Sequence, residues 1–333
     1  MANERIITVI GSLNTDLVTV TDRVPQGGET FTSKSFSTGA GGKGANQGVA
    51  AARTSRRNPK NASSADALSS DVVVRFIGAV GADQFGPTII AGMEADGLDV
   101  TRIKVVEGQT TGVAVIIVEE ATGENRILFN PGANNTLRPE HFTNITDLGT
   151  PKPDLVILQL EIPLDTVLTI IELCKAADVA LLLNPAPAVP LPETVFEGLQ
   201  HLIVNETEAA ILSGRAVETV NAEDFDWGVV TDEFLNKGVK NVVVTLGGKG
   251  SYSSGAIGKG SLLRANKVKV VDSTCAGDTF VGAYGSLYVR SLESEGSWDL
   301  KEAVRKSSKA SELTVQRPGA QVAIPWSDEI NWN

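Results

Sequence analysis

The stretch DLVILQLEIPLDTVLTIIELCKAADVALLLNPAP, residues 154–187, predicts a strand, a helix and a second strand in direct succession. The apolar runs at 154–163 and 179–187 are nearly continuous, which is typical of parallel strands buried on both faces. Residues 164–178, between them, carry apolar side chains at helical spacing. Because strand and helix alternate here without a gap, the stretch indicates an α/β sheet.

The same alternation extends over most of the chain. We expect further strands at 5–11, 72–81, 111–120, 201–208 and 241–248, and further helices at 45–53 and 87–97. This pattern predicts a doubly wound, mostly parallel sheet with helices on both faces.

Two regions break the alternation. Residues 13–38 and about 98–130 contain strand-like segments without helices between them, so we expect them to form a small β-sheet lid over the main domain. The segment 54–71 is polar and rich in Ser, Asn and Ala, and it predicts a loop insertion on the surface.

Composition narrows the class of protein. The 29 Lys and Arg residues against 40 Asp and Glu give a net charge of −11, which disfavours a nucleic-acid surface but not a small phosphorylated ligand. We find no signal peptide and no apolar run that could span a membrane. Cys174 and Cys275 are far apart, which favours the cytoplasm, with the nucleus as an alternative. His141 and His201 show no catalytic pattern, so chemistry must depend on carboxylates, lysine and backbone groups.

The glycine-rich stretch STGAGGKGANQ, residues 37–47, matches neither common nucleotide motif. Its G-x-G-x-x-G follows polar residues rather than a strand, and Lys43 precedes Gly44 where a P-loop needs Ser or Thr. A turn that caps the next helix is one interpretation. We favour a sugar or polyol site, because Lys43 and Asn46 lie beside glycines that allow close approach of a ligand.

Polar residues also follow several of the predicted strands. Asn14 and Asp16 come after the first strand and Glu161 ends another, at the strand ends where ligands of such sheets bind. Asn205 and Glu208 open a helix, and a capping box is the favoured interpretation, with phosphate and hydrated Mg²⁺ contacts as the alternative. VVVTLGGKGS, residues 242–251, is equally consistent with a loop near a nucleotide and with a hairpin-type turn.

The stretch VDSTCAGDTFVGAYGSL, residues 271–287, indicates a strand end, a short loop and a helix. The N–H groups of Ala276, Gly277 and Asp278 lie in the first turn, where they are free to bind an anion. Asp278 could merely cap this turn. That interpretation does not explain the glycine at 277.

Together these motifs resemble the ribokinase (PfkB) family of carbohydrate kinases. Both family signatures are present, at 41–47 and 272–279, with Asn205-x-x-Glu208 between them, and the resemblance runs from residue 6 to about 327. It implies a single catalytic domain over 1–333 that transfers phosphate from ATP. Four motifs, GSLNTD, GGKGANQ, LQLEIP and RPGAQ, favour D-ribose and its 5-hydroxyl. Fructose, a nucleoside, or a non-catalytic sugar-binding role on the same fold are the alternatives.

The resemblance also implies a role for each matching residue. Asp278 would be the general base, and the N–H groups of Ala276 and Gly277 would form the anion hole. The sugar would be held by Asn14, Asp16, Gly42, Lys43, Asn46, Glu161 and Asp278. The nucleotide would contact Asn205, Thr245, Gly247, Gly248, Gly250, Gly277 and Ser308. An activating K⁺ would lie near Asp272, Thr274, Thr314, Arg317, Gly319 and Ala323, and Glu208 would hold the Mg²⁺ of ATP through water.

The edge strands of the lid segments predict a homodimer formed through lid–lid pairing. Two residues depart from the family pattern. Cys275 stands where relatives have Ala, Ser or Gly, and an exposed thiol at this position would be open to oxidation. Ser308 stands where some relatives have Asn, so its contact with the nucleotide is the least secure of the implied contacts.

Overall fold

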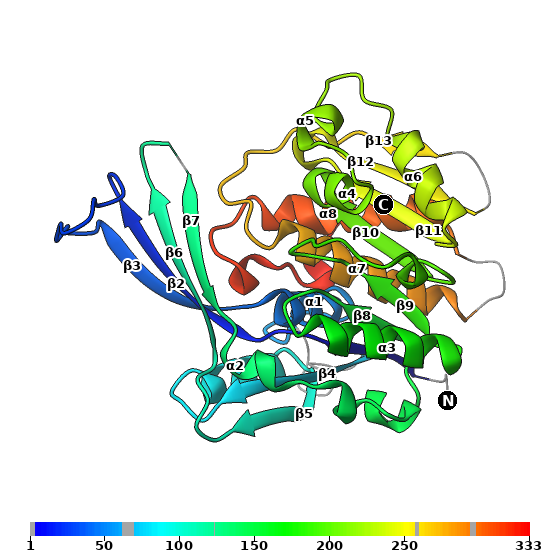
Figure 1. Ribbon diagram of the computed structural model, residues 1–333, viewed down its shortest axis with the longest axis horizontal. Coiled ribbons are helices and arrows are strands. Elements are labelled where there is room, and N and C mark those ends of the chain that lie inside the picture. Colours follow the sequence, from blue (N-terminus) through cyan, green and yellow to red (C-terminus); the bar gives the residue numbers. More distant parts are fainter. Residues whose placement is uncertain (1–3, 62–69, 123, 257–259, 294–297) are drawn as a thin grey trace.

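A nine-stranded sheet forms the centre of the molecule (Figure 1). The computed structural model describes residues 4–61, 70–122, 124–256, 260–293 and 298–333. The strand order is β13-β12-β11-β10-β9-β8-β1-β4-β5, and only the pairs β11–β12 and β12–β13 are antiparallel. The strands are β1 (Arg5–Ile10), β4 (Val72–Gly81), β5 (Asp99–Val106), β8 (Leu155–Leu158), β9 (Ala180–Leu183), β10 (His201–Asn205), β11 (Asn241–Thr245), β12 (Ser251–Gly255) and β13 (Ser261–Leu263).

Helices cover both faces of this sheet. They are α1 (Lys43–Thr54), α2 (Gly86–Ala95), α3 (Leu164–Ala176), α4 (Glu206–Leu212), α5 (Val217–Val220), α6 (Trp227–Asn236), α7 (Ala276–Ser291) and α8 (Leu300–Thr314). Short 3₁₀ turns are η1 (Gly132–Thr136), η2 (Pro139–His141), η3 (Ile145–Leu148), η4 (Glu193–Val195), η5 (Gly247–Lys249), η6 (Gln321–Ala323) and η7 (Ser327–Glu329). The predicted doubly wound α/β fold is confirmed.

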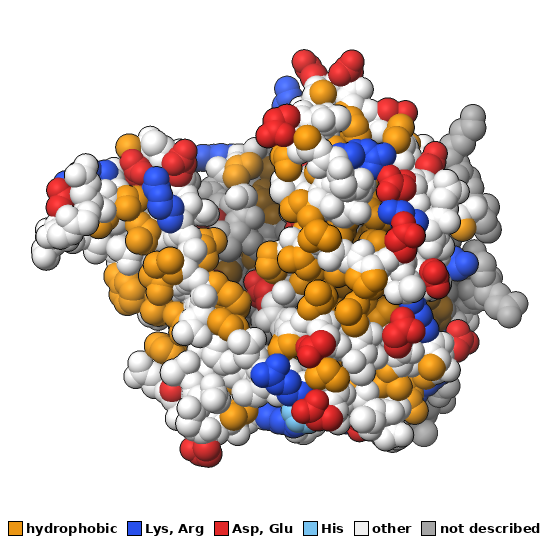
Figure 2. Space-filling view, viewed as in Figure 1, with side chains coloured by type: hydrophobic (Ala, Val, Ile, Leu, Met, Phe, Trp, Pro, Cys, Tyr) orange, Lys and Arg blue, Asp and Glu red, His pale blue; other side chains and the backbone are white. Residues whose placement is uncertain are grey.

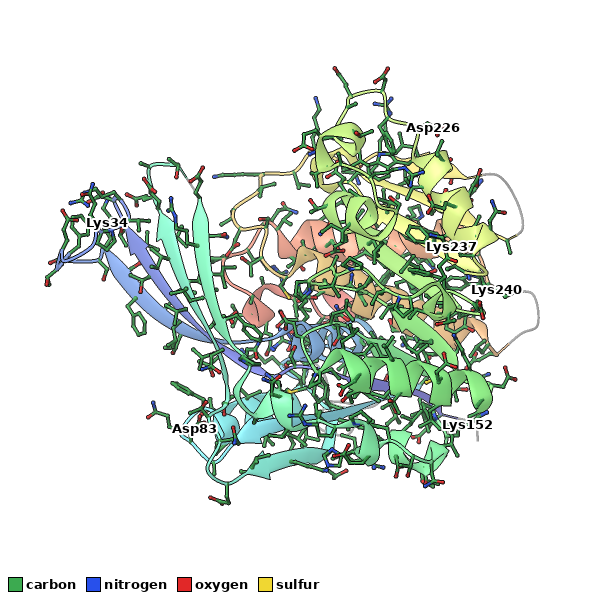
Figure 3. The ribbon with its side chains drawn as sticks, in the orientation of Figure 1. Lys34, Asp83, Lys152, Asp226, Lys237 and Lys240 are labelled. Atoms are coloured by element: carbon green, nitrogen blue, oxygen red, sulfur yellow. The ribbon has the colours of Figure 1, made fainter. Side chains whose placement is uncertain are left out.

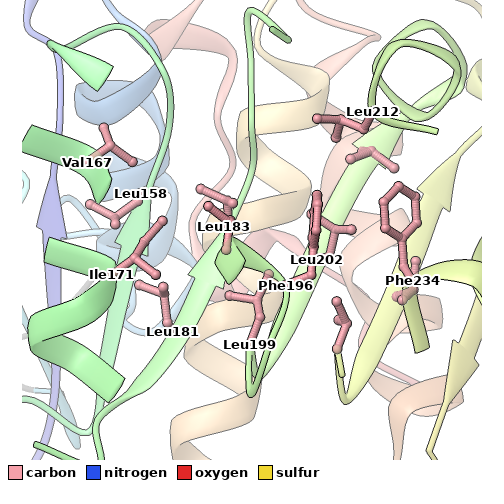
Figure 4. Close-up of a cluster of buried hydrophobic side chains, with 14 of the residues drawn as sticks. Leu158, Val167, Ile171, Leu181, Leu183, Phe196, Leu199, Leu202, Leu212 and Phe234 are labelled. Atoms are coloured by element: carbon pink, nitrogen blue, oxygen red, sulfur yellow. The ribbon is translucent and has the colours of Figure 1, made fainter. Parts of the chain in front are cut away.

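Two hydrophobic cores lie on opposite faces of the sheet because successive strand residues point to opposite sides. Leu181 and Leu183 of β9 pack into the core with α3, α4 and α6, part of which is drawn in Figure 4. Leu182 points the other way, into the core with α1, α2, α7 and α8. In α3, Val167, Ile170, Ile171 and Cys174 are buried at the helical spacing seen in the sequence.

A separate four-stranded sheet forms the lid, which projects from the body in Figure 1. Its order is β3-β2-β6-β7, with β2 (Asn14–Thr21), β3 (Ser35–Gly41), β6 (Gly112–Glu119) and β7 (Asn125–Asn130). The assignment of all of 98–130 to the lid was wrong, because β5 pairs with β4 in the main sheet. As a half-exposed edge strand, β5 alternates polar and apolar residues just as a lid strand does.

Two polar anchors hold the lid, one joining its root to the loop after β4 and one joining its segments near the tip (Figure 3). Near the root, both carboxylate oxygens of Asp83 accept hydrogen bonds from Thr111, from its N–H and its hydroxyl, each at 2.7 Å. Near the far tip, Lys34 forms ion pairs with Asp22 and Glu120.

Several predicted segments are shorter in the structure. The strand expected at 154–163 ends at Leu158, which leaves Glu161 on the loop beyond it, and the segment 201–208 divides into β10 and α4 after Asn205. Part of the 54–71 insertion, residues 62–69, lies outside the described residues. Within the described ranges, no helix has the length and hydrophobicity of a membrane span.

Candidate active site

A cavity of about 230 Å³ lies where the carboxyl end of β10 meets the N-terminus of α7. It brings together residues from both halves of the chain, including Lys43, Asn205, Glu208, Thr245, Ala276, Gly277 and Asp278. Two larger hollows, one beside Arg56 and one beside Tyr252, are lined by none of the predicted site residues. The smaller cavity is therefore the candidate site.

Asp278 lies in the first turn of α7 and is only 9% exposed. Its Oδ2 accepts a hydrogen bond from Nδ2 of Asn46 at 3.0 Å, and its Oδ1 accepts one from Nε2 of Gln47 at 2.9 Å. Both donors come from α1, which packs closely on α7 because Gly282 has no side chain. A Cβ at Gly282 would lie 2.5 Å from the Cβ of Ala50. Close helix packing thus places two amides on the carboxylate.

Gly277 faces open space. A Cβ at this position would meet no heavy atom within 4 Å, and its φ is outside the left-handed region. Nothing in the described protein therefore requires glycine here, yet the residue lines the cavity. The missing side chain leaves free space in front of the α7 N-terminus, whose N–H groups favour an anion.

Cys275 precedes this turn in a left-handed conformation, with φ of 66°. Its thiol is buried rather than exposed. Burial, together with the nearby charge of Asp278, holds the pKa of the thiol well above its usual range. The reactive thiolate is therefore disfavoured at neutral pH.

Glu161 is the hub of the predicted sugar-binding residues. Its Oε2 accepts hydrogen bonds from the Ser12 hydroxyl at 2.6 Å, the N–H of Lys43 at 2.9 Å and Nδ2 of Asn14 at 3.4 Å. Asn134 fixes the other end of Asn14, donating from Nδ2 to its Oδ1 at 2.8 Å. Loops after β1 and β8 and the start of α1 thus meet at one carboxylate.

Two glycines allow this convergence. A Cβ at Gly41 would overlap the Asp16 carboxylate, and one at Gly42 would lie 2.9 Å from the backbone nitrogen of Asn14. Gly42 also has φ of 90°, a conformation that other residues rarely adopt. Burial, reinforced by the charges of Glu161 and Asp278, raises the pKa of Asp16 to about 7.

Lys43 supplies positive charge beside these carboxylates. Burial alone would lower the pKa of its ammonium, but the charges of Asp278, Glu161 and Glu208 outweigh burial and raise that pKa. No salt bridge within 4.0 Å joins Lys43 to another described residue, so the ammonium is available to a ligand.

Asn205 and Glu208 form the predicted capping box. Glu208 N–H donates to Asn205 Oδ1 at 2.8 Å, and Asn205 N–H donates to Glu208 Oε2 at 2.8 Å. Both residues also line the cavity, so capping the helix and facing a ligand are compatible. Burial raises the pKa of Glu208, although the Asn205 hydrogen bond and the charge of Lys43 oppose this shift.

The other residues predicted to contact the nucleotide do not all line the cavity. Thr245 ends β11 and lines the cavity, and Gly247 and Gly248 follow in η5. Gly250, with φ of 109°, has no room for a Cβ against the Leu263 carbonyl, so its glycine has a structural reason. Ser308 is not among the residues that line this cavity; its hydroxyl donates to the Val304 carbonyl within α8 at 2.9 Å.

The predicted K⁺ residues come together in part. The Asp272 carboxylate accepts hydrogen bonds from the N–H groups of Thr274 and Gly319, each at 2.9 Å. Thr314 is buried and bonds to Thr279 at 3.0 Å, Ala323 is buried in η6, and the Arg317 side chain pairs with Glu329. Within the described ranges, His, Cys, Asp and Glu side chains form no cluster of three that could hold a metal ion.

Sequence reasoning missed several supporting residues, namely Ser12, Gln47, Asn134, Gln159, Asn184 and Gln321. All of them except Asn134 stood inside motifs that had already been singled out. Gln321 donates from Nε2 to Asn46 Oδ1 at 3.1 Å, which links the C-terminal tail to the amide that holds Asp278. A polar side chain whose role is to hydrogen-bond another site residue shows no pattern in the neighbouring sequence that would predict this role.

The comparisons with known proteins agree with this fold. The model of the pfkB family carbohydrate kinases matches residues 5–327, and the chain belongs to this family. Ribokinase of Schizosaccharomyces pombe is 42% identical over 98% of this chain and 96% of its own length. Deoxyribokinase of Salmonella typhi is 34% identical over 98% of this chain and 97% of its own. An Arabidopsis thaliana ribokinase structure complexed with ribose and ATP has a TM-score of 0.80 and 29% identity, covering 98% of this chain and 97% of that one.

Proposed function

We propose that this carbohydrate kinase transfers phosphate from ATP to the 5-hydroxyl of D-ribose. The observation that carries the proposal is the pair Gly277 and Asp278 at the start of α7. Gly277 leaves open space for a phosphoryl group, and the buried carboxylate of Asp278 follows directly. The identity to ribokinase of S. pombe and the likeness to a ribokinase complexed with ribose and ATP support the choice of substrates.

The proposed mechanism divides the work between charge stabilisation and proton removal. Asp278 accepts the proton of the attacking hydroxyl, while Asn46 and Gln47 hold its carboxylate in place. The N–H of Gly277 donates to the oxygens of the phosphoryl group in transit, and the N–H of Ala276 does so in place of its long, 3.4 Å hydrogen bond to the Ser273 carbonyl. The ammonium of Lys43 offsets the negative charge of the phosphoryl oxygens. Phosphoryl transfer needs little covalent chemistry from the protein itself.

The sugar hydroxyls would be held by the polar groups around Glu161. Asn14 and Asp16 offer both donors and acceptors, which vicinal hydroxyls need. Gly42, Lys43 and Asn46 would complete the site, since the hydrogen bonds of Glu161 and Asp278 draw them together.

The residues present fit Mg²⁺ that arrives with ATP. Mg²⁺ keeps several waters and binds through one or two carboxylates plus phosphates, so it needs no cage of protein ligands. Glu208 lines the cavity and would hold the hydrated ion, while Asn205, Thr245, Gly247, Gly248 and Gly250 would contact the nucleotide. When bound, the ion neutralises charge on the phosphates of ATP.

We also propose a monovalent cation, K⁺, near Asp272. The fit rests on the two loops that this carboxylate ties together, at Thr274 and at Gly319. Backbone carbonyls of these loops suit a large monovalent ion. They would serve at Arg317 and Ala323 as well, since the Arg317 side chain is engaged with Glu329.

A substrate screen tests the proposed function. ATP consumption is measured with ribose, deoxyribose, fructose, adenosine and 2-keto-3-deoxygluconate, and phosphorus NMR of the product locates the phosphate. We expect the highest kcat/KM for ribose, with phosphate on the 5-hydroxyl. Deoxyribose is the second candidate, because a deoxyribokinase is 34% identical over 98% of the chain. A preference for fructose or adenosine, or sugar binding without turnover, would overturn the proposal.

The lid supports a homodimer. Phe36, Ile127, Leu128 and Phe129 are large apolar residues of β3 and β7 that are 44–68% exposed, and hydrophobic side chains gather over the lid in Figure 2. Exposed apolar patches of this kind mark interaction surfaces. We propose that two lids pair through them. Light scattering should give the mass of a dimer, and a monomer at working concentration would reject the pairing.

We place the protein in the cytoplasm, with the nucleus as an alternative. Cys174 and Cys275 are both buried and unpaired, which suits a reducing compartment. A fluorescent fusion expressed in its native cell would test this placement.

A further inference from the structure

Three buried carboxamides form a chain behind Asp278. Nε2 of Gln159 donates to Oε1 of Gln47 at 2.7 Å. Nε2 of Gln47 donates to Oδ1 of Asn184 and to Oδ1 of Asp278, each at 2.9 Å. Nδ2 of Asn184 donates to the backbone carbonyl of Ile203 at 2.9 Å. The exposed fractions of Gln47, Gln159 and Asn184 are 0%, 1% and 9%, so water has little access to these bonds.

The chain can run in only one direction. The two ends of a carboxamide have the same shape, and only their hydrogen-bond partners decide which end is which. The carbonyl of Ile203 can only accept, so Asn184 turns its NH₂ group toward it and its oxygen toward Gln47. Gln47 must then turn its NH₂ group toward both Asn184 and Asp278, and its oxygen toward Gln159. The Ile203 carbonyl of β10 thereby determines, through Asn184, that Gln47 presents its NH₂ group to the Asp278 carboxylate.

The protein makes room for this chain. A Cβ at Gly11, directly after β1, would overlap the Gln159 side chain and lie 2.9 Å from the Cα of Gly44. The chain ends at Oε1 of Gln159, which is buried and has no hydrogen-bond partner among the described residues. A buried polar atom without a partner destabilises a fold, so the unpaired Oε1 of Gln159 needs a reason.

We propose that Gln47, Gln159 and Asn184 form a directional amide relay that positions Asp278. Gln159 acts at a distance. It contacts Gln47 and not Asp278, yet its NH₂ group keeps the Gln47 oxygen turned away from the carboxylate. If Gln47 rotated by half a turn, its carbonyl would face Asp278, and the carboxylate would lose one of its two amide donors. These three are positioning residues, and their role in catalysis rests on the proposed function.

Two substitutions of similar size at Gln159 test the relay. In Gln159→Glu, a protonated carboxyl can still donate to Gln47, whereas an ionised carboxylate can only accept and draws the Gln47 NH₂ group away from Asp278. In Gln159→Met, the donor is absent at every pH. Neither change touches the sugar or the nucleotide site. Gln84→Glu, at an exposed position outside the relay, controls for the added charge.

We measure kcat and KM of all four proteins between pH 6 and 9, with the sugar that the wild type phosphorylates best. The kcat of Gln159→Glu, divided by that of the wild type, should fall about tenfold or more with rising pH, because a hydrogen bond to a charged group is lost. The ratio for Gln159→Met should be lowered severalfold and stay constant with pH. The KM values should change less than about twofold.

The relay is overturned if Gln159→Glu keeps the wild-type kcat throughout, or if both substitutions give the same pH-independent ratio, because packing alone would then explain them. If Gln159→Glu does not fold, as judged by circular dichroism, the variant Gln47→Met tests the relay instead. It should lower kcat about tenfold to a hundredfold at unchanged KM, and wild-type kcat would overturn the relay. Failure of the proposed function is distinguishable, because the wild type itself would then phosphorylate no ribose.

Discussion

Asn46 Nδ2 lies 3.0 Å from Asp278 Oδ2, a contact between residues that are 232 positions apart in the sequence. It joins the glycine-rich turn that begins α1 to the first turn of α7. The same turn provides the N–H of Lys43 to Glu161 at 2.9 Å. One short segment therefore contacts both the proposed base and the hub of the proposed sugar site.

Gly277→Ala should separate folding from activity. A Cβ here meets no protein atom within 4 Å, and alanine favours a helix over glycine by about 1 kcal/mol, so the melting temperature should not fall. The methyl group would occupy the space that we assign to the phosphoryl group, so kcat should fall about a hundredfold, as on loss of one anion-hole donor.

Gly92→Ala is the matched control for that variant. Gly92 also lies in a helix, α2, with open space where its Cβ would be. It should gain about the same stability and keep full activity. Normal turnover by Gly277→Ala would remove Gly277 from the proposed site.

Stability should decrease below pH 6.5 because of His201. Burial lowers the pKa of this imidazole to about 3, so the folded state holds it neutral and the stabilisation is present only above the unfolded pKa of 6.5. Its Nδ1 lies 2.9 Å from the Tyr284 hydroxyl, and its buried Nε2 has no hydrogen-bond partner among the described residues. Each pH unit below 6.5 should therefore cost about 1.4 kcal/mol of unfolding free energy.

Urea unfolding at pH 7.5 and 5.5 measures this loss. His201→Phe keeps an aromatic ring among Tyr284, Tyr288 and Trp298 but cannot be protonated. The wild type should lose about 1.4 kcal/mol more than the variant between the two pH values. An equal loss in both proteins would assign the pH dependence to other groups.

The KM for ribose should depend on pH through Asp16. Its pKa is raised to about 7 by burial and by the charges of Glu161 and Asp278, so the carboxyl ionises within the working range. The ionised form accepts hydrogen bonds from two hydroxyls, so KM should fall as pH rises from 6 to 8. Asp16→Asn should abolish this trend while raising KM. If the variant kept the wild-type profile, another group would be responsible.

Replacing K⁺ by Na⁺ should lower kcat about fivefold or more, the size of a typical coupling between two sites. Asp272→Ala removes the acceptor that ties Thr274 to Gly319, so it should abolish the difference between the two salts. Binding of Tl⁺ or K⁺ followed by calorimetry gives a readout without turnover. Equal rates in both salts would refute the cation site.

The sequence predicted most of the central sheet because its strands are buried and locally apolar, as at Leu155–Leu158. It misplaced β5, since an edge strand shows the same alternation as a lid strand. Motif residues such as Asn205 and Thr245 were found because strand ends share one edge of the sheet. Gln159 could not be found, because its role depends on how Gln47 is oriented across the sheet, and nothing local in the sequence encodes that contact.

The most direct test of the account is single-turnover kinetics of Asp278→Asn with saturating ribose and ATP. Asparagine preserves the size of the side chain but cannot accept the proton of the hydroxyl. We expect ribose and ATP to bind with affinities near those of the wild type, while the rate of phosphoryl transfer falls by about 10²–10⁴. Phosphoryl transfer at close to the wild-type rate would contradict the assignment of Asp278 as the base.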